Sequence, residues 1–331
     1  MTPAAYTLAD QLYAAAPWNK LAEIYLIALI DPATDERHHI SLMGANGNHL
    51  ALALYLGETG RRRFNAMQEL PMPESDRIEM ILTTPQLQCA FSERSDLMKS
   101  ELAAIKASGK KYRGDCWPSF RRFRPGYGPS PASPEEVTLL CHAIEQALVV
   151  AEQLDDFEDT MRYENGHHTI LTRVQRDGEW VTEWTENDTT LYAFPEPEAP
   201  SFLCEKISRH QKVGLVDISF QMLPTPIGRN RESSTFPYML MVMEPSSEFV
   251  IGCDLFDVEK QPYETLPSAV VDSLLRMFDR HAICPSGFNL ASPVTAALLH
   301  NTATALGIRC HVKEHLPVLD HAINLMLSRM M

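Results

Sequence analysis

The sequence predicts an α+β protein with two domains, each built on an antiparallel β-meander against which helices pack. Its 331 residues and 45% hydrophobic content suffice for two globular cores. Two runs of β-forming residues flank a proline-containing turn at 244–248, and a similar apolar run with an acid–proline corner lies at 25–36. The proline-rich segment 195–200 predicts a linker between a domain over 1–194 and a second domain over 201–331.

In the first domain, a helix over 4–16 is expected to end at Pro17, since proline interrupts helices. Glycine and asparagine at 44–48 predict a tight turn between two strands, and Gly109 suits the left-handed residue that closes a helix. Residue preference and spacing give the other elements. They are strands over 22–30, 38–43, 50–56, 86–91, 168–174 and 180–184, and helices over 57–70 and 92–108.

The clearest helix signal begins at Ser133, which is followed by Pro134 and, three residues after the serine, by Glu136. This is a capping box with proline at the first helical position, and apolar residues continue at helical spacing to Ala151. Downstream, the Asp-Gly pair at 177–178 predicts the turn of a β-hairpin.

In the second domain, strands and helices alternate after a three-stranded meander, which predicts a mixed sheet. The strand at Ile308 should run parallel to its neighbour, because a helix separates the two. The expected elements are strands over 213–223, 237–244 and 248–256, a helix after 267, a short strand near 288, a helix over 292–307, a strand over 308–312 and a helix from 317.

Composition narrows the class of protein. A net charge of −14 makes nucleic acid an unfavourable partner, because a protein that coats nucleic acid needs a cationic surface. No apolar run is long enough to cross a bilayer and no signal peptide is present, so we expect a cytoplasmic protein that inserts in no membrane. Seven scattered cysteines without a C-x-x-C pair predict reduced thiols.

The charge is unevenly distributed. Residues 110–124 hold six basic residues and one acid, whereas residues 152–198 hold thirteen acids and three bases. The segment 110–133 also contains prolines and glycines, which exclude a long helix, and too many aromatic residues for a floppy linker. We therefore expect an ordered loop, pinned by Trp117 and Phe120.

Two roles suit this basic and aromatic segment. In one, its side chains bind phosphates and stack on the bases of a single strand. In the other, which the nearby acidic segment favours, the arginines pair with Asp155, Asp156, Glu158 and Asp159 of the same chain. The candidate binding residues are Arg113, Trp117, Arg121, Arg122, Arg124 and Tyr127.

The element order of the second half, from residue 213 onwards, resembles the ribonuclease H-like fold. That family holds two metal ions for phosphoryl transfer with acids on the first strand, on the fourth strand and on a later helix. Asp217 occupies the first position, Asn289 stands where the second acid is needed, and Asp320 lies on the last helix. The resemblance implies a degenerate fold that serves as a scaffold, and we predict no metal ligands and no catalytic residues.

Histidine patterns give no metal site either. His311 to His315 matches the letters H-x-x-E-H of a zinc protease, but that motif requires a helix and this segment ends a predicted strand. The adjacent pairs at 38–39 and 167–168 would point apart on a strand, so they are expected to be structural or solvated.

Trp117-Pro118, Phe120-Arg121 and the run Arg124 to Tyr127, together with Pro17-Trp18 and Phe236-Pro237, resemble a bacterial two-block family of unknown function. Its blocks cover about 5–190 and 210–331, and the resemblance brings no cofactor. We expect a non-catalytic binding or protein-interaction module with a protein partner or a small ligand, and oligomerisation stays open. The alternative is a phosphoryl-transfer enzyme or nucleic-acid binder on a degenerate ribonuclease H-like domain.

Overall fold

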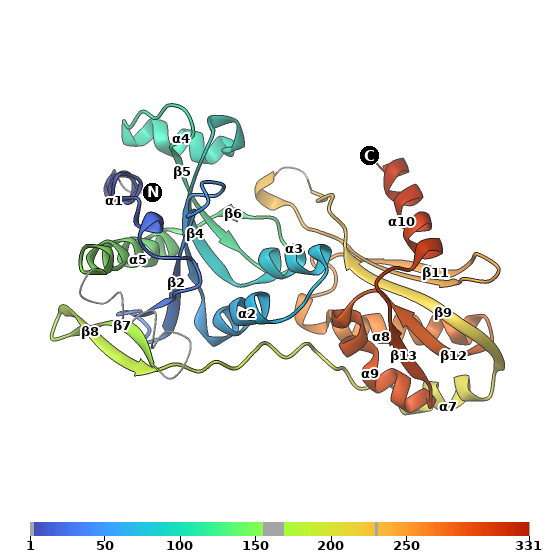
Figure 1. The fold of residues 1–331 in the computed structure, drawn as a ribbon. Helices are drawn as coiled ribbons and strands as arrows, with labels where there is room; N and C mark the ends of the chain where they lie inside the picture. The colour runs from blue at the N-terminus through green and yellow to red at the C-terminus, as the bar shows by residue number, and fades with distance from the viewer. Residues whose placement is uncertain (1–2, 155–168, 229–230, 331) are drawn as a thin grey trace. The chain divides into compact units, whose positions relative to one another are not determined.

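The computed structural model describes residues 3–154, 169–228 and 231–330. The chain divides into two compact units, each with one β-sheet and packed helices (Figure 1). The first unit comprises residues 1–70, 82–192 and 230–233, and the second comprises 71–81, 193–229 and 234–331. The predicted α+β class, with two sheet-containing regions, is confirmed.

The first unit contains an eight-stranded sheet in the order β6-β5-β4-β3-β2-β1-β7-β8. Strands β1 to β6 follow one another as antiparallel neighbours, so the meander predicted there is confirmed. Strand β7 joins the other side of β1 in parallel, because the chain crosses over through helix α5 between β6 and β7. The strands are β1 Ile27–Ile30, β2 Arg37–Met43, β3 Ala51–Tyr55, β4 Gln86–Ser92, β5 Trp117–Phe123, β6 Ser130–Pro131, β7 Thr169–Arg176 and β8 Glu179–Glu186.

Helices α1 and α5 pack together and bury the main core of this unit against the sheet. Tyr6 of α1 meets Phe120 of β5 edge to face, with 5.7 Å between ring centroids. The capping box of α5 is confirmed, since Ser133 Oγ accepts the N–H of Glu136 and the Glu136 carboxylate accepts the N–H of Ser133. The helices are α1 Pro3–Ala15, α2 Gly57–Glu69, α4 Lys99–Ser108 and α5 Pro134–Glu152.

Three predictions in this unit were wrong in extent. Residues 22–26 precede β1 as a turn, and the helix expected over 92–108 begins only at Lys99. The loop expected over 110–133 contains β5, which pairs with β4 along its whole length. Pro118 is tolerated in β5 because β6 pairs only with Arg121 and Arg122, which leaves Pro118 at an edge where its missing N–H removes no bond on that side.

The second unit contains a five-stranded sheet in the order β11-β10-β9-β12-β13. Strands β9, β10 and β11 form the predicted antiparallel meander. Strand β12 lies parallel to β9, and β13 lies parallel to β12, which confirms the direction predicted for the strand at Ile308. The strands are β9 Gln211–Met222, β10 Tyr238–Glu244, β11 Phe249–Phe256, β12 Ile283–Leu290 and β13 Arg309–Val312.

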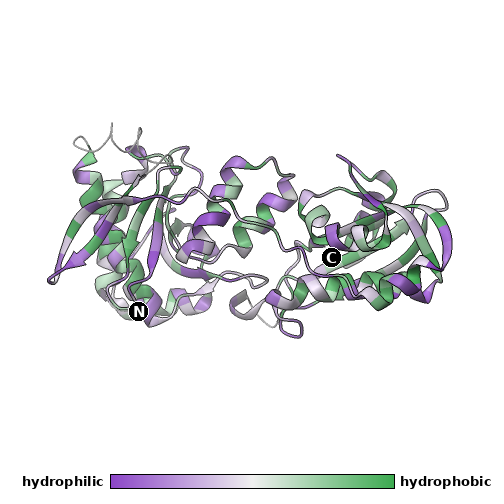
Figure 2. Ribbon diagram, turned by 90° about the horizontal axis from the view of Figure 1, so that it is seen from below, coloured by the Kyte–Doolittle hydropathy of each residue, from purple (hydrophilic) through white to green (hydrophobic). Residues whose placement is uncertain are grey.

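The helices of the second unit include two that the sequence analysis did not predict, α3 and α7. Helix α3 is tied to the start of α9, because Ser292 Oγ donates a hydrogen bond of 2.6 Å to Asp76. In Figure 2 the hydrophobic colour concentrates on the strands, whereas the tip of the β7–β8 hairpin in the first unit is hydrophilic. The helices are α3 Glu74–Thr83, α7 Ser201–Ser208, α8 Leu266–Arg280, α9 Pro293–Leu306 and α10 Pro317–Met330.

Candidate functional site

A surface groove in the first unit forms where α4 turns back towards β5. Helix α4 is fixed at its start by Glu101, whose Oε2 accepts the N–H of Met98 at 2.7 Å. It ends at Gly109, whose φ of 77° is the left-handed conformation expected for that residue. The chain then runs back to Trp117, which pairs with Ser92 at the ends of β5 and β4.

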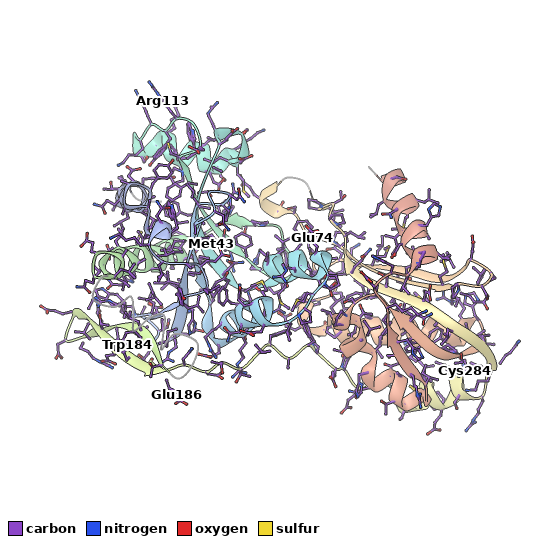
Figure 3. The ribbon with its side chains drawn as sticks, viewed as in Figure 1. Met43, Glu74, Arg113, Trp184, Glu186 and Cys284 are labelled. Carbon is purple, nitrogen blue, oxygen red and sulfur yellow. The ribbon has the colours of Figure 1, made fainter. Side chains whose placement is uncertain are left out.

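The groove has a volume of about 620 Å³ and combines an apolar floor with a cationic rim. We call it the basic–aromatic groove. Within the described part of the chain, no carboxylate lines it. Figure 3 shows the exposed side chain of Arg113 at the edge of the first unit, beside α4. The lining residues are Arg94, Leu102, Ala103, Ile105, Lys106, Gly109, Lys110, Lys111, Tyr112, Arg113 and Trp117.

Trp117 is held in the groove by two neighbours. The Tyr112 ring lies 5.8 Å from it between centroids, and the Arg94 guanidinium lies 5.8 Å from the ring centroid. Burial raises the pKa of Tyr112, so its hydroxyl stays neutral. Lys110 pairs with Asp10 at 2.7 Å, whereas Lys106, Lys111 and Arg113 form no ion pair with any described residue.

The structure brings only two of the six candidate binding residues, Arg113 and Trp117, into this groove. Arg121 forms two hydrogen bonds of 2.8 Å with the buried Glu101 carboxylate. Arg122 pairs with Glu136 at 3.3 Å.

Arg124 lies 4.2 Å from the centroid of the Tyr127 ring, so these two candidates contact each other. The partners predicted for the arginines, Asp155 to Asp159, lie outside the described residues. Glu101 and Glu136, which were not predicted as partners of these arginines, supply the counter-charge that the structure shows for Arg121 and Arg122.

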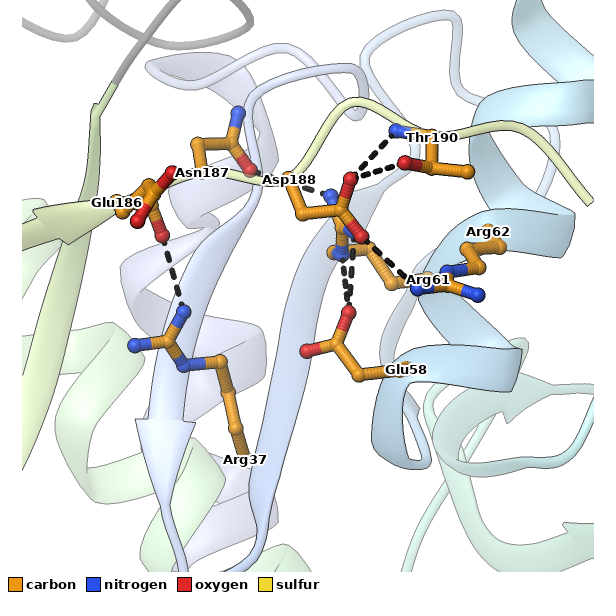
Figure 4. Close-up of polar contacts among 8 residues, drawn as sticks. All are labelled: Arg37, Glu58, Arg61, Arg62, Glu186, Asn187, Asp188 and Thr190. Carbon is orange, nitrogen blue, oxygen red and sulfur yellow. Dashed lines mark hydrogen bonds and ion pairs between the residues drawn. The ribbon is translucent and has the colours of Figure 1, made fainter.

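A second polar cluster holds the segment 187–192 against α2 (Figure 4). Arg61 is 1% exposed and pairs with Glu58 at 3.0 Å and with Asp188 at 2.8 Å. Arg62 also contacts Asp188, and Arg63 lies 4.2 Å from the Tyr192 ring centroid. The pKa of Asp188 falls to about 2, chiefly because Thr190 donates hydrogen bonds to it. The sequence signal for this cluster was the run of three arginines within a predicted helix.

In the second unit, Asp217 of β9 and Asn289 of β12 are directly opposed and buried. The amide nitrogen of Asn289 donates to Asp217 Oδ1 at 2.7 Å. No group of three or more metal-ligating side chains occurs among residues 3–154, 169–228 and 231–330. The H-x-x-E-H letters begin on β13, outside any helix, and His315 is exposed.

We predict that Mg²⁺ or Mn²⁺ will not raise the melting temperature, because the amide of Asn289 already occupies one oxygen of Asp217. Thermal unfolding with and without each ion measures this, and the Asp217→Asn variant is the control. A rise in melting temperature that this variant abolishes would contradict the prediction.

The fold and the groove define a two-unit α+β protein with a cationic surface groove. A family model described as a domain of unknown function (DUF7309) matches residues 3–173, and a second one (DUF6930) matches residues 204–327. The chain belongs to the DUF7309 family, since that match covers more than half of it, and the predicted two-block organisation of unknown function is confirmed. No curated protein matches the chain. In the described part, no helix has the length and apolarity of a membrane span.

Proposed function

We propose that the chain is a non-catalytic binding module whose basic–aromatic groove holds an acidic segment of a partner protein with one apolar anchor residue. The observation that supports this proposal is that the groove combines cationic side chains at its rim with apolar side chains at its floor. Arg94, Lys106, Lys111 and Arg113 line the groove beside the apolar side chains of Leu102, Ile105 and Trp117, and no carboxylate of the described residues joins them. Its volume of about 620 Å³ lies within the range of ordinary ligand pockets, which is about 300–1,000 Å³.

Two observations favour a peptide over a nucleic acid. Trp117 is contacted by both Tyr112 and Arg94, so its ring is less available for stacking on a base. The net charge of −14 repels a long polyanion more than a short acidic segment. The occupant supported by the groove is therefore a short sequence with carboxylates around a large apolar side chain.

The setting proposed for this module is the bacterial cytoplasm, which the seven free cysteines support, because disulfides are rare there. We also propose domains over 1–194 and 201–331, joined by a linker over 195–200. The two family matches, over 3–173 and 204–327, support this division.

The test is fluorescence anisotropy with a labelled peptide that carries several glutamates around one phenylalanine. Reversing two rim charges in Lys111→Glu/Arg113→Glu is expected to weaken binding about tenfold, which corresponds to ~1.4 kcal/mol, because each exposed charge contributes a fraction of that energy. Binding should also weaken as salt is added.

The control changes the same charge elsewhere, in Lys260→Glu/Arg309→Glu of the second unit, where both residues are exposed. A peptide with glutamine in place of glutamate tests whether carboxylates are required. Equal losses in the two variants, or binding of oligothymidylate but not of the acidic peptide, would refute the proposed function.

A further inference from the structure

Strand β11 forms one margin of the second sheet. Its inner side pairs with β10 from Phe256 to Phe249, and it is the terminal strand in the sheet order (Figure 1). No described strand pairs with its outer side. The backbone N–H and C=O groups on that side are therefore available to another strand.

Apart from one bulge, this edge lacks the usual protection against pairing. Three of its apolar side chains are exposed, namely Phe249 at 54%, Val250 at 40% and Leu255 at 55%. Between Phe249 and Phe256 the strand has no lysine, arginine or proline, and Asp254 is its single charged residue. The strand itself was predicted from the sequence, over 248–256.

A bulge decides which side chains share a face. Val242 opposes Gly252 and Met243 opposes Val250, so Ile251 is an extra residue in the ladder. Val250, Cys253 and Leu255 consequently share the face of Met243, Met241 and Met239. Phe249, Gly252, Asp254 and Phe256 lie on the opposite face.

We propose that β11 pairs antiparallel with β11 of a second copy of this chain, about a two-fold axis at Cys253. With Ile251 again the extra residue, Leu255 opposes the partner subunit's Val250 and Phe256 opposes the partner subunit's Phe249. Asp254 opposes the partner subunit's Gly252. Every opposed pair then has both side chains on one face, as an antiparallel ladder requires.

The strand is complementary to itself, and this identifies a second copy as the partner. The exposed apolar side chains at its two ends meet each other, and the single carboxylate meets a glycine, so no like charges are opposed. An isologous interface of this kind closes as a dimer, because the outer side of β11 is then paired in both copies.

The predicted register places Cys253 next to the partner subunit's Cys253, and Cys253 is exposed. Directly opposed residues of antiparallel strands have Cα atoms about 4.5–5.5 Å apart, within the range that a disulfide spans. Diamide should therefore join the two subunits, with two thiols oxidised to one disulfide and diamide reduced to its hydrazine. The Cys253→Ser variant should lose this cross-linked dimer.

The decisive measurement is the mass of the full chain in solution, by sedimentation or light scattering. We expect a dimer for the native sequence and a monomer for Val250→Glu/Leu255→Glu, which opposes like charges at both ends. Val250→Glu/Leu255→Lys opposes unlike charges at the same positions, so it should restore the dimer. Circular dichroism checks that each variant is folded.

The matched control is Val312→Glu, which puts a charge on β13 at the other margin of the same sheet, where Val312 is 55% exposed. This variant should remain a dimer. A monomeric native chain, a dimer that only Val312→Glu disrupts, or equal cross-linking in Cys253→Ser would overturn the proposal. If the native chain is a monomer, the partner of β11 would instead be a strand of a different protein.

Discussion

Replacing Arg121 with methionine should lower the free energy of unfolding of the first unit by about 3 kcal/mol or more. The side chain of Glu101 is 2% exposed, and Arg121 contacts both of its oxygens at 2.8 Å. Removing the arginine leaves a buried carboxylate with no charged partner, and such losses typically cost about 3–5 kcal/mol. Because the pair is buried, added salt should change this loss little.

Urea unfolding followed by tryptophan fluorescence measures the effect in the first unit alone, because residues 18, 117, 180 and 184, the four tryptophans, all belong to it. Adding Glu101→Gln to the variant should restore much of the stability, since it removes the unpaired charge and keeps an oxygen for the N–H of Met98.

Arg122→Met is the matched control for this prediction. Its pair with Glu136 is longer, at 3.3 Å, and the two side chains are 35% and 21% exposed. We expect a loss below about 1 kcal/mol, which salt should reduce further. Equal losses for Arg121→Met and Arg122→Met would show that burial of Glu101 does not decide the energetics.

Local signals in the sequence predicted the ends of several elements correctly. The Ser133 capping box starts α5, the Asp177-Gly178 pair turns the β7–β8 hairpin with both φ values positive, and Gly307 closes α9 with a φ of 68°. Each of these features depends on residues within one turn of chain. A single sequence contains that information in full.

The partners of the arginines depend on contacts far apart in the chain, and they were not predictable in the same way. Arg121 meets Glu101 from a different element, and Arg61 meets Asp188 across more than a hundred residues. Proximity in sequence pointed to the acidic run 155–159 as the partner of Arg113, Arg121, Arg122 and Arg124, and that run lies outside the described residues. In the structure, Glu101 of α4 contacts Arg121 of β5, and Glu136 of α5 contacts Arg122 of β5.

The candidate groove was predictable only in part, for the same reason. Arg113 and Trp117 were identified from the combination of charge and aromatic residues within one segment. Arg94 and Lys106 come from elsewhere in the chain, and they join the groove because β4 pairs with β5 and α4 packs beside them. A basic and aromatic run therefore predicts which kinds of side chain a site contains better than it predicts which residues line the site.

The first unit should lose stability as the pH falls below about 6.5, the ordinary pKa of histidine. His38 and His39 of β2 are both buried. Burial lowers the pKa of His39 well below its usual range, and the neighbouring Arg61 and Arg37 lower it further. Burial also lowers the pKa of His38, against the opposing effect of Glu36 and Asp31.

Both imidazoles are consequently neutral in the folded protein at a pH where they are protonated in the unfolded chain. The unfolded state binds more protons in that window, so acid favours unfolding, by up to about 1.4 kcal/mol per pH unit for each histidine. Above about pH 6.5 both states are neutral at these residues, and the effect disappears. His38 adds a structural reason, because its Nδ1 accepts the N–H of Gly57 at 3.1 Å and cannot do so when protonated.

The variant that tests this is His39→Leu. Neither ring nitrogen of His39 has a hydrogen-bond partner among the described residues, so leucine removes two unpaired polar atoms as well as the titrating group. Urea unfolding between about pH 5 and pH 7.5, again followed by tryptophan fluorescence, should show an acid slope that is shallower by up to about 1.4 kcal/mol per pH unit. His315→Leu, at an exposed position of the second unit, controls for the loss of a histidine as such. An unchanged acid slope in His39→Leu would show that this histidine does not couple folding of the first unit to pH.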